Sequence, residues 1–137
     1  MAQVTIKING YDRVANNMRR LATELDRELD KDVRAWAQNT RGDLKAEPYP
    51  PKRPNQQYVR TGRLANSWGV RKAGKSRYEI VNSAVYAHYV VGNHLGKEQA
   101  WMHKGRWWLA RNMIQDRVPE LTRRISAKIR KLSGAGR

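Results

Sequence analysis

Hydrophobic residues recur at two different periods in the first third of the chain. Between residues 4 and 8 apolar positions alternate with polar ones, which predicts a half-buried strand. The spacing then changes to steps of three and four, which is typical of one face of an amphipathic helix. This stripe consists of Val14, Met18, Leu21, Leu25, Leu29, Val33 and Trp36. We predict a long helix over 12–44, although Gly42 makes an end near Thr40 equally compatible with the pattern.

A proline-rich segment follows at 45–58. It holds four of the five prolines of the chain. Proline fixes φ and has no backbone N–H, so neither a helix nor a central strand is expected there. The pattern predicts an extended, exposed arm.

Residues 59–91 are predicted to form a small antiparallel sheet. Strands over 64–70 and 77–81 are joined through the turn-forming residues 73–76 and make a hairpin. The β-branched and aromatic run at 84–91 fits a further strand or a short helix, and the pattern does not choose between them.

Helical spacing returns in the last third of the chain. An irregular loop at 92–105 precedes a closing amphipathic helix over 106–132 and a basic tail at 133–137. Its apolar positions are Trp107, Ile114, Val118, Leu121, Ile125, Ile129 and Leu132. Pro119 interrupts the pattern. Either the helix kinks there, or Asp116 caps a second helix with Pro119 in its first turn, where proline is tolerated.

The order strand, long helix, sheet, closing helix predicts a single α+β domain. A small antiparallel sheet would pack against the long N-terminal helix and the C-terminal helix. The chain of 137 residues is long enough to bury a modest core. It has no apolar stretch long enough to span a bilayer, and residues 1–10 lack the features of a signal peptide, so neither membrane insertion nor secretion is expected.

Charge points to an anionic environment or partner. The chain has 28 Lys and Arg against 12 Asp and Glu, a net charge of +16. Residues 63–137 carry most of this excess, with sixteen basic and only four acidic side chains. A nucleic-acid binder and an assembly subunit beside DNA or an acidic neighbour meet the same electrostatic demand, so charge alone does not choose between them.

Candidate catalytic and metal-binding groups are few. The chain has no cysteine, which excludes disulfides, thiolate zinc sites and a cysteine nucleophile. His88, His94 and His103 are the only histidines, and we interpret them as polar surface or interface residues rather than as metal ligands. No glycine-rich phosphate loop is present. We therefore expect no enzyme activity, no metal, no cofactor and no small-molecule substrate.

Two motifs in the middle of the chain carry a family resemblance. Arg-Thr-Gly-Arg-Leu-Ala-Asn-Ser at 60–67 is similar to an opening "TG-x-L-x-x-S", and the stretch at 81–90 is similar to "N-x-x-x-YA-x-Y-V". The aromatic entry to the last helix at 106–110 follows the same layout. The chain thus resembles the small tail-component proteins of long-tailed bacteriophages, which act in the neck or complete the tail.

The motif residues make sense as a scaffold. Thr61 and Gly62 are expected to start a strand, with glycine allowing a backbone conformation closed to other residues. Leu64 and Trp68 would face one side of that strand. Tyr86, Tyr89 and Val90 are expected to fill the layer between the sheet and a helix.

The resemblance implies a structural subunit of the virion neck or proximal tail, made in the host cytoplasm. It implies a closed, sixfold homo-oligomeric ring that joins the head connector to the tail tube around the DNA channel. Expected partners are other neck, connector and tail-tube proteins, with non-specific contact to packaged DNA. The alternative is a small basic nucleic-acid-binding protein that acts outside a virion.

Two sets of candidate residues follow. The arm is too long for a simple turn and too rich in proline for a core, so we expect it to contact adjacent subunits. The expected subunit-interface residues are Tyr49, Pro51, Arg53, Tyr58, Arg60, Thr61, Gly62, Tyr86, Tyr89 and Trp108. The residues expected to face DNA in the lumen or an acidic partner are Arg124, Lys128, Arg130, Lys131 and Arg137.

Overall fold

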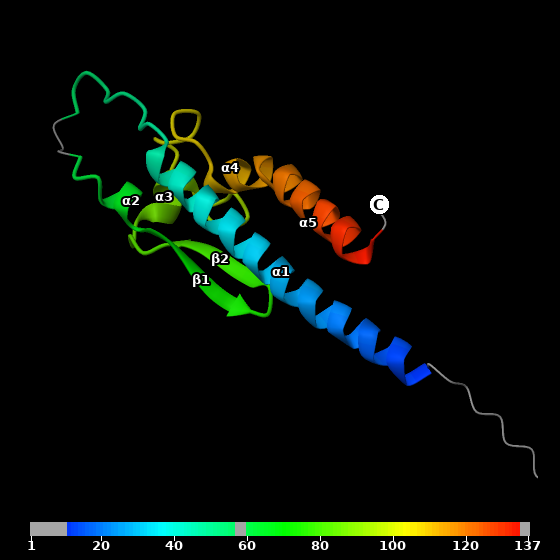
Figure 1. The fold of residues 1–137 in the computed structure, drawn as a ribbon. Coiled ribbons are helices and arrows are strands. Elements are labelled where there is room, and N and C mark those ends of the chain that lie inside the picture. The colour runs from blue at the N-terminus through cyan, green and yellow to red at the C-terminus, as the bar shows by residue number, and fades with distance from the viewer. Residues whose placement is uncertain (1–10, 57–59, 135–137) are drawn as a thin grey trace, which may run out of the picture.

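The computed structural model describes residues 11–56 and 60–134. The predicted strand at 4–8 and the candidates Tyr58 and Arg137 lie outside the described residues. The elements in chain order are α1 (Tyr11–Ala46), α2 (Arg63–Asn66), β1 (Trp68–Gly74), β2 (Arg77–Asn82), α3 (Ala87–Val91), α4 (Ala110–Asp116) and α5 (Val118–Ser133). A long helix, an antiparallel hairpin and a C-terminal helix pack together in this part of the chain, which confirms the predicted α+β class (Figure 1).

The long helix α1 organises the fold, because both the hairpin and α5 pack against it. α5 runs antiparallel to α1. The indole Nε1–H of Trp36 donates to the backbone carbonyl of Arg117, just before α5, at 2.9 Å. Further along, the Lys128 ammonium lies 3.3 Å from the carboxylate of Glu28. Figure 1 shows that α1 continues beyond the end of α5.

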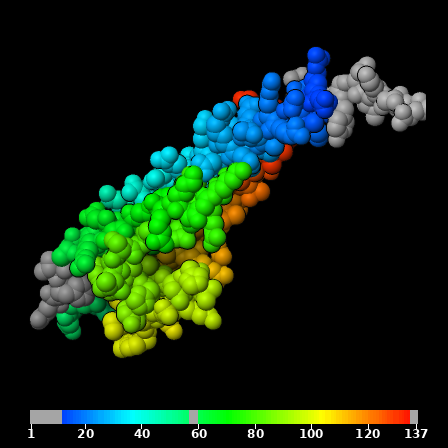
Figure 2. Space-filling model, turned by 90° about the horizontal axis from the view of Figure 1, so that it is seen from below, coloured from blue at the N-terminus to red at the C-terminus, as the bar shows by residue number. Residues whose placement is uncertain are grey.

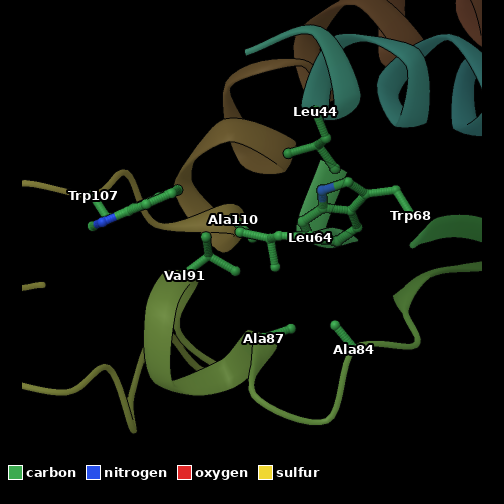
Figure 3. Packing of buried hydrophobic residues seen from close by; sticks show 8 residues of the cluster. All are labelled: Leu44, Leu64, Trp68, Ala84, Ala87, Val91, Trp107 and Ala110. Carbon is green, nitrogen blue, oxygen red and sulfur yellow. The ribbon is translucent and has the colours of Figure 1, made fainter. Parts of the chain in front are cut away.

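The hydrophobic core lies at the C-terminal end of α1. Figure 3 shows its buried residues converging from α1, α2, the hairpin, α3 and α4. They are Leu44, Leu64, Trp68, Ala84, Ala87, Val91, Trp107 and Ala110. Alanines at three of these positions let the short helices approach closely, and the two tryptophans fill the remaining volume.

The hairpin is confirmed, but the predicted sheet over 59–91 is wrong at both ends. β1 starts at Trp68, and Leu64 is buried from the short helix α2 instead of from a strand. Gly62 does not start a strand. It adopts a left-handed backbone with φ of 75°, and its carbonyl accepts the amide of Asn66 at 3.0 Å, which closes one helical turn.

The open alternative at 84–91 is settled in favour of a helix over its second half. α3 begins after Tyr86, and its turn is closed by the amide of Gly92 donating to the carbonyl of His88 at 3.0 Å. Val90 and Tyr86 pack against the core, as expected. Tyr89 is 55 % exposed, so its predicted place between sheet and helix is wrong.

The predicted closing helix over 106–132 is two helices. α4 and α5 are separated by Arg117, and Pro119 lies in the first turn of α5, so the second alternative is confirmed. The residue at the N-cap is Arg117, however, and not Asp116. Helical structure also starts later than expected, because residues 101–106 form turns and a bend at Trp107 follows, with the Trp107 side chain in the core.

The apolar stripe of α1 is covered over only part of its length. Trp36 and Leu44 are buried, whereas Met18 is 67 % exposed and its neighbours Val14 and Leu21 on the same stripe are also exposed. Figure 2 shows this end of α1 projecting from the body of the molecule. Among the described residues, no helix is both long and apolar enough to cross a membrane.

Candidate functional site

Six of the residues expected at a subunit interface line one pocket of about 400 Å³ beside the arm. They come from the arm, from the turn before α2 and from the start of α3. These residues are Tyr49, Arg53, Arg60, Thr61, Gly62 and Tyr86. Segments up to 37 residues apart in the chain are therefore brought together on one surface, which we call the arm pocket.

Arg60 lies at the centre of the aromatic side of the arm pocket. Its guanidinium carbon is 5.6 Å from the ring centres of both Tyr49 and Trp107, within the range of a cation–π contact. Its Nη1 donates to the carbonyl of Pro50 at 2.5 Å. Its Nε and Nη2 are buried and have no hydrogen-bond partner among the residues that the structure describes.

Reciprocal hydrogen bonds hold the arm against the loop that precedes α4. Arg53 of the arm donates to the carbonyl of Met102 at 3.0 Å, and Arg106 of the loop donates to the carbonyl of Pro51 at 2.6 Å. The Tyr49 hydroxyl accepts the amide of Ala65 at 2.9 Å. The arm is thus fixed to the body at both edges of the pocket.

The arm pocket is electropositive. Four arginines line it and no lining residue is acidic; the arginines are Arg53, Arg60, Arg63 and Arg106. His103 also lines it, and burial together with the charges of Arg106 and Arg53 holds the pKa of its imidazole below the usual value. The neutral form of the His103 ring is therefore favoured, and its buried Nδ1 has no hydrogen-bond partner within residues 11–56 and 60–134.

Sequence reasoning missed eight of the fourteen residues that line this pocket. Arg63, Met102, His103, Arg106 and Trp107 line it but were not among the candidates. Most of them come from the run Trp-Met-His-Lys-Gly-Arg-Trp-Trp at 101–108, where aromatic and basic residues are concentrated. That concentration was the available signal, but its position opposite the arm depends on long-range packing.

Two of the expected interface residues lie elsewhere. Tyr89 is exposed on α3, with its ring 4.0 Å from that of His88. Trp108 is half-buried and stacks on Trp68 at 6.4 Å, so it contributes to the core rather than to the pocket.

The expected basic surface lies on α5 and faces partly toward α1. Arg130 and Lys131 are exposed, and Arg124 is half-buried. Lys128 is engaged within the chain, because its ammonium pairs with Glu28. This hydrogen bond, followed by the contact with Lys31, lowers the pKa of the Glu28 carboxyl.

The three histidines do not converge. His88 and His94 line a second pocket of about 450 Å³ next to Trp68, whereas His103 lines the arm pocket. Within residues 11–56 and 60–134 there is no group of three or more His, Cys, Asp or Glu side chains placed to hold a metal ion.

An exposed apolar helix face, a basic surface and an arginine-lined pocket are features of proteins that bind other macromolecules. Comparison with known families gives the particular class. The family model described as "Bacteriophage HK97-gp10, putative tail-component" matches residues 12–90, more than half of the chain. The chain therefore belongs to this family of bacteriophage tail components. No curated protein and no solved structure matches it.

Family membership confirms the resemblance stated from the two central motifs. The match runs from α1 to α3 and includes the arm, Arg60 and Tyr86. The family consists of structural phage proteins, and a tail component belongs to the virion. Residues 91–137, which include α4, α5 and the Trp107 wall of the arm pocket, lie beyond the matched range.

Proposed function

We propose that this protein is a subunit of a closed neck or tail-completion ring, which joins the head connector to the tail tube around the DNA channel. The ring is a hexamer of the chain, and the protein performs no catalysis. Its partners are copies of itself and the neck, connector and tail-tube proteins above and below it.

The observation that carries this proposal is the uncovered end of α1. Val14, Met18 and Leu21 continue the stripe that is buried further along the same helix, yet they are exposed. Contiguous apolar residues on a projecting helix are costly in water and are typical of a surface that a partner covers. In a ring, a neighbouring subunit covers this face with a different surface of its own, because the contacts of a closed ring are head-to-tail.

The basic surface of α5 serves the same assembly. Arg124, Arg130 and Lys131, with Arg137 beyond the described residues, face either DNA in the channel or an acidic rim of a neighbouring ring. A channel that must release DNA requires weak, sequence-independent attraction, which phosphate contacts provide and salt weakens.

The test is to make the projecting face polar in the phage. The variant Val14→Thr/Met18→Gln/Leu21→Gln should fold normally, because these side chains are exposed in the monomer. Loss of an apolar anchor at an interface costs about 1–2 kcal/mol or more, so infectious yield should fall by at least about tenfold. Electron microscopy should show DNA-filled heads and separate tails.

A matched control uses a polar position of the same helix segment. Arg20→Gln/Thr23→Ala changes residues that line a shallow depression on α1 away from the apolar stripe. It should leave yield unchanged. Sedimentation of the purified protein should give a particle of six 15.9 kDa chains for wild type and control, and a monomer for the apolar-face variant. Normal joining by that variant would overturn the proposal.

The rival function, DNA binding outside a virion, is favoured by the net charge of +16. Replacing Arg123, Arg124, Arg130 and Lys131 by Gln separates the two functions. Lys128 is kept, because its removal would leave Glu28 without its partner. If joining fails while DNA affinity and its salt dependence stay unchanged, the face binds proteins. If DNA affinity falls and joining is normal, the rival is correct.

A further inference from the structure

We propose that the arm pocket binds a carboxylate-bearing segment of an acidic partner protein, with Arg60 receiving the carboxylate. The inference rests on the proposed function in that the partner is a neighbouring protein of the virion. The occupant is one Asp or Glu side chain, or a C-terminal carboxylate, together with an apolar side chain beside it.

The two unpaired donors of Arg60 define the ligand geometry. Nε and Nη2 lie along one edge of the guanidinium, where their N–H bonds point the same way and match both oxygens of a single carboxylate. Nη1 is already engaged by the carbonyl of Pro50, which fixes the orientation of the group. A buried donor without a hydrogen-bond partner costs free energy, because it has lost its contact with water. A bound carboxylate would supply a partner to both Nε and Nη2.

The walls of the pocket select for an apolar neighbour beside the carboxylate. Trp107, Tyr86 and Val90 line it, and Tyr49 packs on Trp107 with ring centres 4.9 Å apart. A volume of about 400 Å³ is at the small end of ligand pockets and suits one or two side chains. The contacts that hold the arm at Pro51 and Met102 pre-form this space, which lowers the entropic cost of binding.

Burial of the donors favours a protein carboxylate over a DNA phosphate. Nε and Nη2 of Arg60 lie beneath the surface, and the guanidinium lies beside the Tyr49 and Trp107 rings. A side chain on a flexible segment can enter such a space, whereas phosphates on the outside of a duplex contact arginines that project from a surface. Exposed basic residues of α5, such as Arg130, suit DNA better.

Charge favours a different protein over a second copy of this chain. The whole chain has only twelve carboxylate side chains. Several of them already form ion pairs within the fold; these are Asp26, Glu28, Asp30, Asp43 and Glu79. A second copy of this chain therefore offers few free carboxylates to the four arginines of the pocket.

The test measures binding of short peptides to the full-length protein. The probe is the acetylated, amidated peptide Ser-Gly-Leu-Glu-Gly-Ser, and its matched control has Gln in place of Glu. NMR spectra of the Arg60 Nε–H and the Trp107 Nε1–H report binding at the site. We expect both signals to shift with the Glu peptide and the Gln peptide to bind roughly tenfold to a hundredfold more weakly.

Variants distinguish a carboxylate fork from general attraction. Arg60→Lys keeps the charge but loses the paired donors, so it should lower the affinity for the Glu peptide by about tenfold or more. Arg77→Gln, an exposed arginine on the hairpin, removes a charge elsewhere and should leave peptide binding unchanged. Equal binding of the Glu and Gln peptides, or full binding by Arg60→Lys, would overturn the proposal. So would a duplex oligonucleotide that shifts the Arg60 Nε–H while the Glu peptide does not.

Head-to-tail joining, measured with Arg60→Lys phage, separates this inference from the proposed function. Loss of peptide binding together with loss of joining supports both. A second outcome is that the peptide binds wild-type protein in the expected way while phage that lack the whole protein still join heads to tails. That result supports carboxylate binding by the arm pocket and contradicts the neck function. If joining requires the protein and the Glu peptide leaves Arg60 unaffected, the neck function stands and the pocket proposal falls.

Discussion

The two ends of α1 carry the same hydrophobic pattern but differ in what covers it. At the C-terminal end, Leu44 is 1 % exposed and lies among residues of α2, the hairpin and α4. At the N-terminal end, Met18 is 67 % exposed and Val14 is 57 % exposed. Periodicity therefore shows that a helix has an apolar face, but it does not show whether the chain itself or a partner covers that face.

The middle of α1, where Leu25, Leu29 and Val33 are half-buried, also makes polar contacts. Asp26 pairs with Lys75 at 2.7 Å, and Asp30 accepts the hydroxyl of Tyr78 at 2.9 Å, which fastens the hairpin to the helix. Glu28 holds α5 through Lys128. The acidic residues of the first half of the chain thus offset part of the positive charge of the second half, so only the remainder is available to partners.

The largest expected effect contrasts the two ends of α1 directly. Leu44→Ala removes a fully buried side chain and should lower the free energy of unfolding by about 3 kcal/mol, through lost transfer energy and the cavity left behind. Met18→Ala should change it by no more than about 0.5 kcal/mol in the monomer, because that side chain is mostly in water. Urea unfolding of dilute protein measures both. Similar losses for the two variants would show that both ends are covered within one chain.

A smaller effect is expected where the turn before α2 meets this core. Gly62 has φ of 75°, and a Cβ there would meet only an ordinary contact with Asn66 at 3.5 Å, so strain alone penalises a side chain. Gly62→Ala should lower the free energy of unfolding by about 1–2 kcal/mol. Gly42 lies inside α1 with open space around it, so Gly42→Ala should stabilise the protein by about 0.5–1 kcal/mol. The thermal midpoint should therefore fall for Gly62→Ala and rise for Gly42→Ala. Shifts in the same direction would contradict this prediction.

Local signals predicted the long elements of this fold, and long-range packing decided the rest. Hydrophobic spacing along the chain predicted α1 and the amphipathic α5. Turn-forming residues at 73–76 predicted the hairpin. α2 and α3 have only four and five residues, too few for a period, so the motif around Leu64 resembled a strand. Their helical form is stabilised by burial in the core.

The arm pocket was half predictable for the same reason. Tyr49, Arg53 and Arg60 were singled out by the arm and the motif that follows it, both local features. Arg106 and Trp107 complete the pocket from a loop whose path depends on contacts across the fold, such as the hydrogen bond to Pro51. The sequence shows an excess of aromatic and basic residues there, but not which segment they face.

Asp30 and Tyr78, at the junction between the covered and uncovered parts of α1, respond to pH in opposite ranges. The Tyr78 hydroxyl donates to the Asp30 carboxylate, and this hydrogen bond is the main cause that lowers the pKa of Asp30. The pKa of Tyr78 is raised, first by burial and then by its hydrogen bond to Asp30. The pair therefore stabilises the fold only while Asp30 is ionised and Tyr78 is neutral.

The smallest expected effect concerns how the stability of the fold depends on pH. The Asp30–Tyr78 contact makes stability fall at both acid and alkaline pH, and Tyr78→Phe should weaken this dependence. Because the pKa of Asp30 is lower in the folded state, its contribution is complete above the unfolded value of about 4 and is lost as pH falls through the folded value. Because the pKa of Tyr78 is higher in the folded state, its contribution is complete below about pH 10 and is lost as pH rises through the folded value. Tyr78→Phe should therefore lower the thermal midpoint at neutral pH. It should also make the midpoint change less steeply with pH at the acid and the alkaline ends of the profile. Tyr89→Phe changes an exposed tyrosine and should leave the profile unchanged. A Tyr78→Phe profile that runs parallel to the wild-type profile at both ends would show that this contact does not couple the hairpin to α1.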